Sequence, residues 1–263
     1  MQFKDQLNTV FELKKTPKRI VSLVPSITEL LVDLGLNEFI IGVTKFCVHP
    51  SYINKEKTIV GGTKTIKIDK IKALQPDIII CNKEENTKEI VANCKEVNST
   101  YVSDIYTIAD TLELINQFGK IFSCEIRAKE IIIAILEKHN NFLDFMNGKK
   151  PKKVAYFIWK NPWMVAANHT FINHLLHTNK FENVFIKEDR YPEVHLEELI
   201  KTENLDAVFL SSEPYPFQEK DVLKLQQKFT STKIILVDGE CFSWYGSRLL
   251  IAFDYFKNLH NKF

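Results

Sequence analysis

The loop Thr44-Lys-Phe-Cys-Val-His-Pro50 carries a thiol and an imidazole close together, Cys47 and His49. Thiolate sulfur and imidazole nitrogen both coordinate transition metals well, so the pair is a candidate for contact with a metal centre. Two donors from one loop do not complete a site, and the alternative is that Cys47 is a small buried residue near a strand end and His49 an ordinary loop residue. For a ligand whose metal has an open axial position, we expect His49 to be the donor.

Aromatic side chains are concentrated in the segments that follow the expected strands. Exposed rings there suit a large, flat, partly apolar ligand such as a corrin, a porphyrin or an aryl siderophore, because its faces can stack on them. Arginine and lysine side chains nearby can meet peripheral carboxylates or phosphates. The candidate ligand-binding residues are Pro25, Ser26, Phe46, Cys47, His49, Lys64, Lys83, Trp159, Trp163, Arg190, Tyr191, Glu213, Tyr215, Phe242, Trp244, Tyr245 and Arg248. The alternative is that the rings are ordinary core packing.

No catalytic arrangement emerges from the residue types. Glu84 and Glu85 are adjacent, so their side chains point apart in a helix or a strand. Ser211-Ser212-Glu213 lacks the glycines of a nucleophile elbow, and Gly61-Gly62-Thr63-Lys64 lacks the spacing of a phosphate-binding loop. We therefore predict a binding protein with no enzymatic activity and no intrinsic cofactor. In the enzymatic alternative, Cys47 is the first nucleophile to test.

Composition narrows the class of protein further. A net charge of +2 over 263 residues gives no electrostatic reason to expect nucleic acid as a partner. No segment is long and apolar enough for membrane insertion, and the odd number of widely spaced cysteines does not indicate a disulfide framework. The first residues show no signal-peptide pattern, which indicates the cytoplasm, or the periplasm if an export signal lies outside this sequence. We expect a monomer.

Short apolar runs alternate with amphipathic stretches along the chain, which is typical of parallel sheets covered by helices. We predict strands at 19–24, 39–43, 78–81, 100–102, 153–158, 207–210 and 234–237. We predict helices at 28–34, 67–74, 86–96, 108–122, 171–179, 196–202, 219–228 and from residue 247 onward. In open sheets of this kind, ligands bind beyond the carboxyl ends of the strands, where the candidate residues fall.

The stretch Glu125–Met146 contains neither glycine nor proline and ends at Asn147-Gly148. This pattern predicts one long helix that connects two halves of similar alternation, the alternative being a surface helix within one domain. The predicted fold class is α/β, with two Rossmann-like lobes of mostly parallel sheet joined by one long backbone helix. The predicted lobes are 1–122 and 151–263, with the helix in 123–150. Such a helix restricts hinge motion between lobes.

The segment Arg19-Ile-Val-Ser-Leu-Val-Pro-Ser-Ile-Thr-Glu-Leu-Leu31 reads as a buried strand that runs through Pro25 and Ser26 into a helix. Ser26 or Thr28 is the expected helix cap, and Glu29 suits the first turn. Together with KIDKIKALQPDIII (67–80) and RYPEVHLEELIKTENLDAVFLSSE (190–213), this segment resembles the helical-backbone (class III) substrate-binding proteins of ABC importers for cobalamin, haem and ferric siderophores, most of all the cobalamin-binding members.

This resemblance implies that a metal chelate of the cobalamin, haem or ferric-siderophore type is held in a cleft between the two lobes, without chemical change. It also implies docking to an ABC permease dimer through one acidic residue on each lobe. The matching positions are Asp69 and Glu197, and Asp69 departs from the glutamate usual in the family. In the alternative, both are acidic residues of a first helical turn, where their negative charge interacts favourably with the helix dipole. The alternative to an importer component is a cytoplasmic carrier or sensor of a corrinoid or metal chelate, which needs no permease. A protein that binds a free metal ion would need further metal ligands that converge in the cleft.

Overall fold

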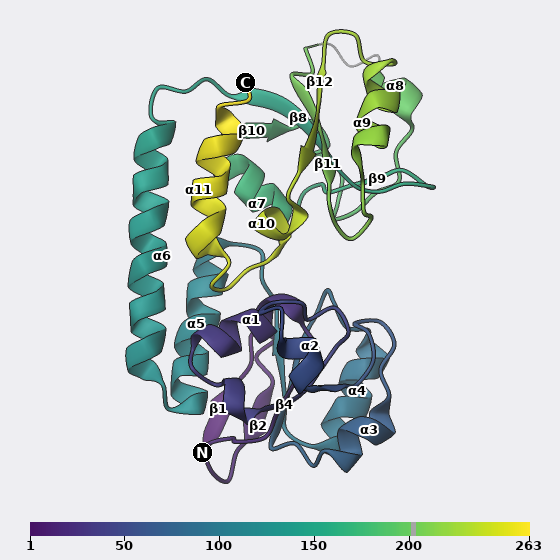
Figure 1. The fold of residues 1–263 in the computed structure, drawn as a ribbon. Helices are drawn as coiled ribbons and strands as arrows, with labels where there is room; N and C mark the ends of the chain where they lie inside the picture. Colours follow the sequence, from purple (N-terminus) through teal and green to yellow (C-terminus); the bar gives the residue numbers. More distant parts are fainter. Residues whose placement is uncertain (201–203) are drawn as a thin grey trace. The chain divides into compact units, whose positions relative to one another are not determined.

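The computed structural model describes residues 1–200 and 204–263 of the chain. Its parallel strands fall into two separate sheets, one in each of two structural units (Figure 1). Unit 1 consists of residues 1–136 and 245–249, and unit 2 of residues 137–244 and 250–263. Helix α6 (Glu125–Met146) therefore contributes its first half to unit 1 and its second half to unit 2. Among the described residues, no helix is long and apolar enough to cross a bilayer.

The sheet of unit 1 has the strand order β5-β4-β3-β6-β7, and all its neighbouring strands are parallel. The strands are β3 (Ile20–Ser22), β4 (Ile40–Val43), β5 (Thr58–Ile59), β6 (Ile78–Asn82) and β7 (Thr100–Ser103). The helices are α1 (Pro25–Asp33), η1 (Asn37–Phe39), α2 (Ile53–Glu56), α3 (Ile68–Ala73), α4 (Lys88–Val97) and α5 (Ile108–Phe122). A short antiparallel hairpin, β1 (Gln2–Lys4) with β2 (Val10–Glu12), precedes them.

The sheet of unit 1 has buried side chains on both of its faces. Every residue of β6 is buried, as a strand covered on both faces requires. Ile79 and Cys81 pack against Ile90 and other residues of α3 and α4 on one face. On the other face, Tyr101 of β7 meets Phe118 of α5 edge-on, with 5.2 Å between ring centroids.

The sheet of unit 2 has the parallel order β10-β8-β11-β12, and β9 pairs antiparallel with β8. The strands are β8 (Lys152–Trp159), β9 (Met164–Val165), β10 (Phe181–Asn183), β11 (Ala207–Ser211) and β12 (Lys233–Val237). The helices are α7 (Phe171–Thr178), α8 (Leu196–Ile200), α9 (Glu219–Gln226), α10 (Gly239–Ser243) and α11 (Leu249–His260). Residues of α8 and α9 pack on one face, whereas Phe242 of α10 and Phe256 of α11 join Tyr156 and Phe209 on the other.

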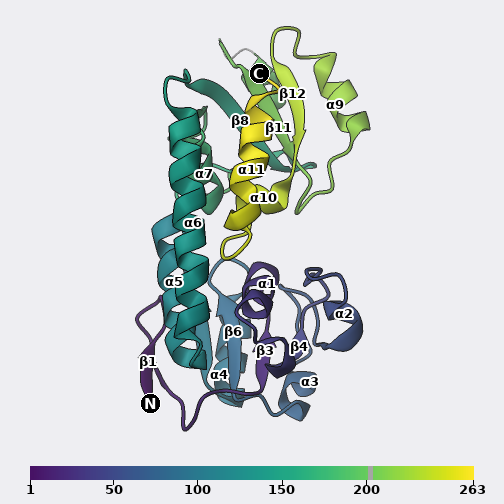
Figure 2. The same cartoon turned by 60° about the vertical axis from the view of Figure 1, so that its left-hand side comes forward.

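Each half of α6 packs against a helix of its own unit, as both views show (Figure 2). In unit 1, α6 lies so close to α5 that a Cβ atom at Gly119 would stand 2.9 Å from the Cβ of Ala128. In unit 2, the α6 residues Lys138 and His139 contact Asp254 and Phe253 of α11, through an ion pair and a stacked ring. The glycine at 119 is what permits the close approach of α5 and α6.

The predicted α/β class with two lobes and a long helix is confirmed, and each predicted strand overlaps an observed one. The prediction for 196–202 is met by α8 as far as Ile200, and the remainder lies outside the described residues. The elements that sequence reasoning missed are all short: β1, β2, β5, β9, β10, η1, α2 and α10. Such short segments do not show enough of a period to be recognised.

The predicted start of the first helix is wrong, because α1 begins at Pro25 and has Val24 as its N-cap, without a side-chain capping bond. Proline suits the first helical position, since it lacks the N–H that would otherwise need a partner there. The hydroxyl of Thr28 instead donates to the carbonyl oxygen of Val24 inside the helix, at 2.9 Å. Glu29 falls beyond the first turn, and its carboxylate pairs with Arg248.

Candidate ligand-binding site

The candidate residues lie at the carboxyl ends of the parallel strands, where an open α/β sheet exposes its loops. We call the segments after β3, β4, β5, β6 and β7, together with 245–248, the unit 1 edge. We call the segments after β8, β11 and β12 the unit 2 edge.

Asn82, the last residue of β6, shapes the loop that follows it on the unit 1 edge. Its side-chain oxygen accepts hydrogen bonds from the backbone N–H groups of Glu84 and Glu85, at 2.8 and 3.0 Å. Its side-chain amide donates to the carbonyl and hydroxyl oxygens of Ser103 in β7, at 3.2 and 3.0 Å. Because every polar atom of this buried amide is used within the fold, the loop from Lys83 to Glu85 has a defined shape.

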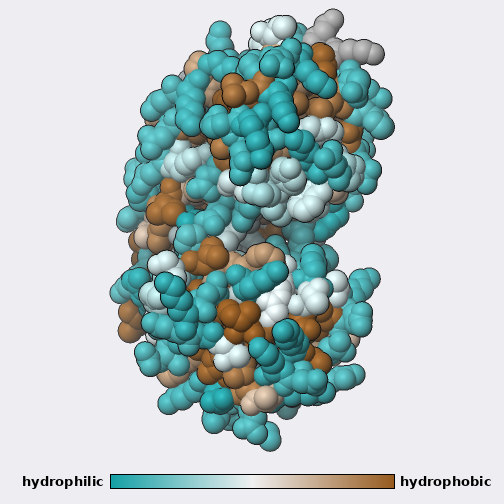
Figure 3. Space-filling view, turned by 45° about the vertical axis from the view of Figure 1, so that its right-hand side comes forward, coloured by the Kyte–Doolittle hydropathy of each residue, from teal (hydrophilic) through white to brown (hydrophobic). Residues whose placement is uncertain are grey.

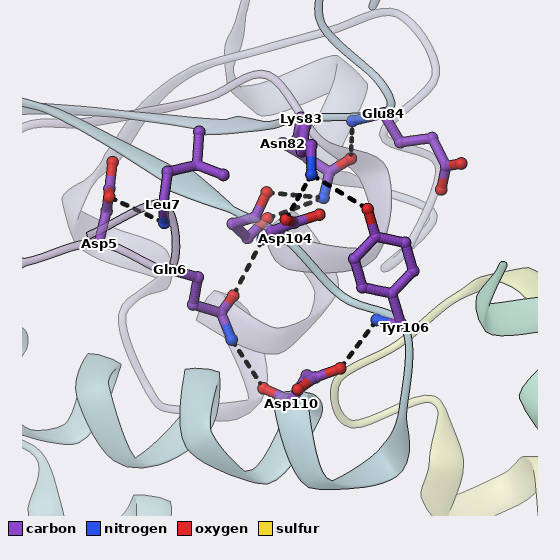
Figure 4. Close-up of polar contacts among 10 residues, drawn as sticks. Asp5, Gln6, Leu7, Asn82, Lys83, Glu84, Asp104, Tyr106 and Asp110 are labelled. Atoms are coloured by element: carbon purple, nitrogen blue, oxygen red, sulfur yellow. Dashed lines mark hydrogen bonds and ion pairs between the residues drawn. The ribbon is translucent and has the colours of Figure 1, made fainter. Parts of the chain in front are cut away.

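Lys83 projects from this loop toward two side chains that follow β7 (Figure 4). Its ammonium lies 2.7 Å from Oδ2 of Asp104 and 3.0 Å from the hydroxyl of Tyr106. These two hydrogen bonds raise the pKa of Lys83, so the amine stays charged. The predicted ligand-binding cation is thus already paired with a carboxylate.

Arg248 is also paired within the unit 1 edge. Its Nε and Nη2 atoms lie 2.9 and 2.7 Å from the two carboxylate oxygens of Glu29. Burial raises the pKa of Glu29, and the charge of Arg248 opposes that rise. The side chain of Arg248 is only 7% exposed, so its main role in this structure is the fork-shaped ion pair with Glu29.

Cys47 and His49 do not form a metal-binding group by themselves. Cys47 is fully buried, with its sulfur 3.1 Å from the hydroxyl of Thr28 and 3.3 Å from that of Thr44. Burial raises the pKa of the Cys47 thiol, which disfavours the thiolate that a metal needs. His49 is half-buried in the same loop. The part of the chain that the structure describes holds no group of three or more His, Cys, Asp or Glu side chains that could hold a metal ion.

The rest of the unit 1 edge combines an exposed apolar loop with buried polar groups. Phe46 is 49% exposed, with the ammonium of Lys45 4.9 Å from its ring centroid, and Val48 and Tyr52 are exposed in the same loop. Lys64 donates to the carbonyl oxygen of Glu84 at 2.5 Å. Of the other predicted residues, Pro25 is half-buried, Ser26 and Tyr245 are buried, and the Tyr245 hydroxyl lies 3.5 Å from that of Ser103.

The unit 2 edge carries a series of touching rings that runs from the surface into the core. Trp159, at the end of β8, is 39% exposed and meets Tyr215 edge-on, with 5.5 Å between ring centroids. Tyr215 in turn contacts Phe217 at 4.6 Å, and Phe217 stacks on Trp163 at 6.0 Å. Trp159 and Tyr215 form the accessible end of this series, and Phe217 forms its buried end.

Two of the predicted aromatic residues of unit 2, Phe242 and Trp244, are hardly exposed to solvent in this structure. Phe242 is fully buried against Tyr156 and Phe256, with ring centroids 5.1 and 4.8 Å away. Trp244 is buried, and Trp163 is partly buried against Phe157. The placement of Phe242 supports a packing role for that residue.

The polar candidates of unit 2 have partners of their own. Glu213 accepts a hydrogen bond from the hydroxyl of Ser243, at 2.6 Å from its Oε1. Arg190 has a positive φ of 57° and lies 6.0 Å from the ring of Tyr191. Both Arg190 and Tyr191 are half-buried in the segment between β10 and α8.

The two acids expected to dock to a permease are both exposed in the first turns of helices. Asp69 lies in α3 of unit 1, and Glu197 lies in α8 of unit 2. Both positions are compatible with docking to a permease. They are equally compatible with acidic residues whose only role is a favourable interaction with the helix dipole.

A surface hollow of about 510 Å³ lies elsewhere, at the amino ends of the unit 2 strands. Its lysines include Lys152, which pairs with Asp206 at 3.2 Å, and Lys233, which donates to the Lys262 carbonyl oxygen at 2.8 Å. The hollow is at the opposite end of the sheet from the unit 2 edge, so it contributes nothing to the predicted site.

On the face of the molecule shown in Figure 3, apolar groups are interspersed with hydrophilic ones.

Sequence reasoning missed Asp104, Tyr106 and Gln6. Asp104 and Tyr106 follow β7, so the strand-end rule would have found them if it had been applied to that strand. Gln6 comes from the N-terminal hairpin, and its Oε1 accepts from the backbone N–H of Asp104 at 3.2 Å. Nothing in the sequence pattern points to that contact.

Comparison with known proteins agrees with this architecture. A family model described as periplasmic binding protein matches residues 20–235. An uncharacterised ABC transporter substrate-binding lipoprotein of Bacillus subtilis is 23% identical over 212 residues, covering 78% of this chain and 67% of that protein. A vitamin B12-binding protein of Vibrio campbellii is 28% identical over 207 residues, covering 74% of this chain and 70% of that protein.

A solved structure described as a periplasmic haem-binding protein from Pseudomonas aeruginosa superposes with a TM-score of 0.80 and 18% identity, over 92% of each chain. At that identity the match shows the fold alone. The family match covers most of the chain, including both parallel sheets except the last two residues of β12. This chain belongs to the periplasmic binding protein family.

Proposed function

We propose that this protein is the substrate-binding component of an ABC importer, and that it holds a metal chelate of the cobalamin, haem or ferric-siderophore type without changing it chemically. Family membership and the vitamin B12 and haem named for two similar proteins support this reading. The observation that carries it in this chain is the exposed face of Trp159, held edge-on by Tyr215 at the carboxyl end of β8.

An exposed tryptophan braced by a second ring is a suitable platform for a flat ligand. The indole already has its orientation fixed by Tyr215, so little side-chain freedom is lost when a ligand stacks on it. The exposed loop of Phe46 offers a corresponding apolar surface on the unit 1 edge. We propose both surfaces as ligand contacts, and each can be tested separately.

Titration with cyanocobalamin, haemin and a panel of ferric siderophores tests the proposal, with tryptophan fluorescence and visible absorption as readouts. We expect saturable one-to-one binding of one ligand class and quenching of tryptophan fluorescence. The variant Trp159→Ala tests the proposed stacking surface. Leu223→Ala is its matched control, because Leu223 is a large apolar residue of unit 2 that is exposed on α9. Absence of binding to every probe would contradict the proposed function.

His49 is proposed as the axial donor if the bound metal offers a free position, in preference to the buried Cys47. Replacement of His49 by Ala is then expected to change the visible spectrum of bound haemin or cobalamin. An identical spectrum would reduce His49 to a loop residue.

Docking to a permease dimer through Asp69 and Glu197 is part of the same proposal. Their exposed carboxylates can meet arginine side chains of a membrane partner. We expect Asp69→Lys and Glu197→Lys to leave ligand affinity unchanged and to abolish uptake in reconstituted vesicles. Unchanged uptake would contradict docking through Asp69 and Glu197, and absence of uptake with the wild-type protein would favour a carrier or sensor that needs no permease.

A further inference from the structure

Three cations of the unit 1 edge have acceptors within the same edge, which bears on the ligand groups that they can bind. Arg248 is held by both carboxylate oxygens of Glu29, and Lys83 is held by Asp104. Lys64 donates to a carbonyl oxygen of Glu84, and its charge acts on the neighbouring carboxyl of Glu85. Lys83 and Arg248 thus have carboxylates as partners within the edge, whereas the exposed Lys45 lies over the ring of Phe46.

Lys83 and Asp104 form the charged pair of this set that remains accessible. Their side chains are 46% and 19% exposed, in contrast to 7% for Arg248. An ammonium has three N–H donors, and two of those of Lys83 point to Asp104 and Tyr106. Oδ2 of Asp104 receives Lys83, and Oδ1 belongs to the same partly exposed carboxylate. The pair therefore presents a donor and an acceptor side by side.

Hydrogen bonds behind the pair fix its position before any ligand arrives (Figure 4). The side chain of Gln6 accepts from the backbone N–H of Asp104 and donates to the carbonyl oxygen of Asp110 at 2.9 Å. Asp110 in turn accepts from the backbone N–H of Tyr106 at 3.0 Å. On the other side, the Asn82 turn holds Lys83. A donor and an acceptor held this way lose little entropy on binding.

From this geometry we propose that Lys83 with Asp104 binds a carboxamide or hydroxyl group on the periphery of the ligand in preference to a carboxylate. A carboxamide accepts from the ammonium and donates to the carboxylate, whereas a ligand carboxylate would face Asp104 as a like charge. This inference rests on the proposed function and narrows its ligand class.

Three probes separate failure of this inference from failure of the proposed function. Cyanocobalamin carries peripheral carboxamides, its acid-hydrolysed monocarboxylates carry one carboxylate in place of a carboxamide, and haemin carries two propionates. We expect the wild-type protein to bind cyanocobalamin about tenfold more tightly than at least one monocarboxylate isomer, and more tightly than haemin. If haemin or an anionic ferric siderophore binds and cyanocobalamin does not, the inference is overturned while the proposed function stands. If no probe binds, both are overturned.

Variants then assign the preference to the pair. Asp104→Asn removes the like charge, so the preference for the carboxamide over the carboxylate is expected to fall about tenfold, and Asp104→Glu is expected to restore part of it. Asp254→Asn is the matched control, because Asp254 forms a comparable ion pair with Lys138 in unit 2. Thermal unfolding verifies that each variant is folded. An unchanged preference in folded Asp104→Asn would overturn the assignment.

Discussion

Arg248 and Glu29 lie 219 positions apart in the sequence, yet their side chains form a two-pronged ion pair within unit 1. The pair anchors the segment 245–249 to helix α1, and the Leu30 side chain lies 3.3 Å from the position of a Cβ at Gly246. This contact explains how a segment close to the end of the chain belongs to the unit that its beginning forms.

Replacing Glu29 by Gln should destabilise unit 1 because it leaves a buried guanidinium without its carboxylate. We expect a loss of about 3 kcal/mol in the free energy of unfolding, typical of breaking a buried ion pair from one side. The double variant Glu29→Gln/Arg248→Met should recover part of this loss. Urea unfolding monitored by circular dichroism measures both, and an unaltered midpoint in Glu29→Gln would contradict a stabilising pair.

Trp159 and Trp163 should respond differently to replacement by alanine, although the sequence pattern treats them alike. Trp159→Ala removes an exposed stacking face, so we expect ligand affinity to fall by about 1–3 kcal/mol with little change in stability. Trp163→Ala leaves a gap against Phe157 and Phe217, so we expect a loss of about 3 kcal/mol in stability. Ligand titration and thermal unfolding of both variants separate the two roles; equal effects would refute the distinction.

Low pH should destabilise the fold of unit 2, because the folded state disfavours protonation of His260. Its ring stacks on Phe181 at 4.8 Å, and burial, assisted by the charge of Lys149, lowers its pKa from 6.5 to about 4. Between those values the unfolded chain binds more protons than the folded one, so the free energy of unfolding falls as the pH drops from 6.5 toward 4. His260→Phe should lessen this loss. Urea midpoints at about pH 7.5 and about pH 5 test it, and identical acid sensitivity of the variant would exclude His260 as a cause.

Thiol reactivity should distinguish Cys124 from the other cysteines. Cys47, Cys81, Cys94 and Cys241 are buried, whereas Cys124 is only half-buried. A hydrogen bond with Cys94, together with burial, raises the pKa of Cys81 well above its ordinary value, so its thiolate is scarce. We expect iodoacetamide to modify Cys124 first in the native protein and all five thiols after unfolding. Peptide mass spectrometry locates the labels, and early labelling of Cys81 would contradict the packing around β6.

Much of the architecture could be predicted from local patterns. The run Ile78-Ile-Ile-Cys81 has the composition of a strand buried on both faces, and Glu125–Met146 has the uninterrupted pattern of one helix, so both were predicted close to their observed limits. The strand-end rule likewise located Lys83 and Trp159, because parallel strands bring the loops after them to one edge of the sheet. These inferences depend only on residues near one another in the sequence.

The sequence by itself determined the α/β alternation, the long helix and the edges at which functional side chains gather. Only the tertiary structure decided which of those side chains are available. Phe242 is covered by Phe256 and Arg248 is paired with Glu29, whereas Lys83 stays exposed beside Asp104. Burial and ion pairing depend on neighbours brought together by folding, often from distant positions, and no local period or spacing records them.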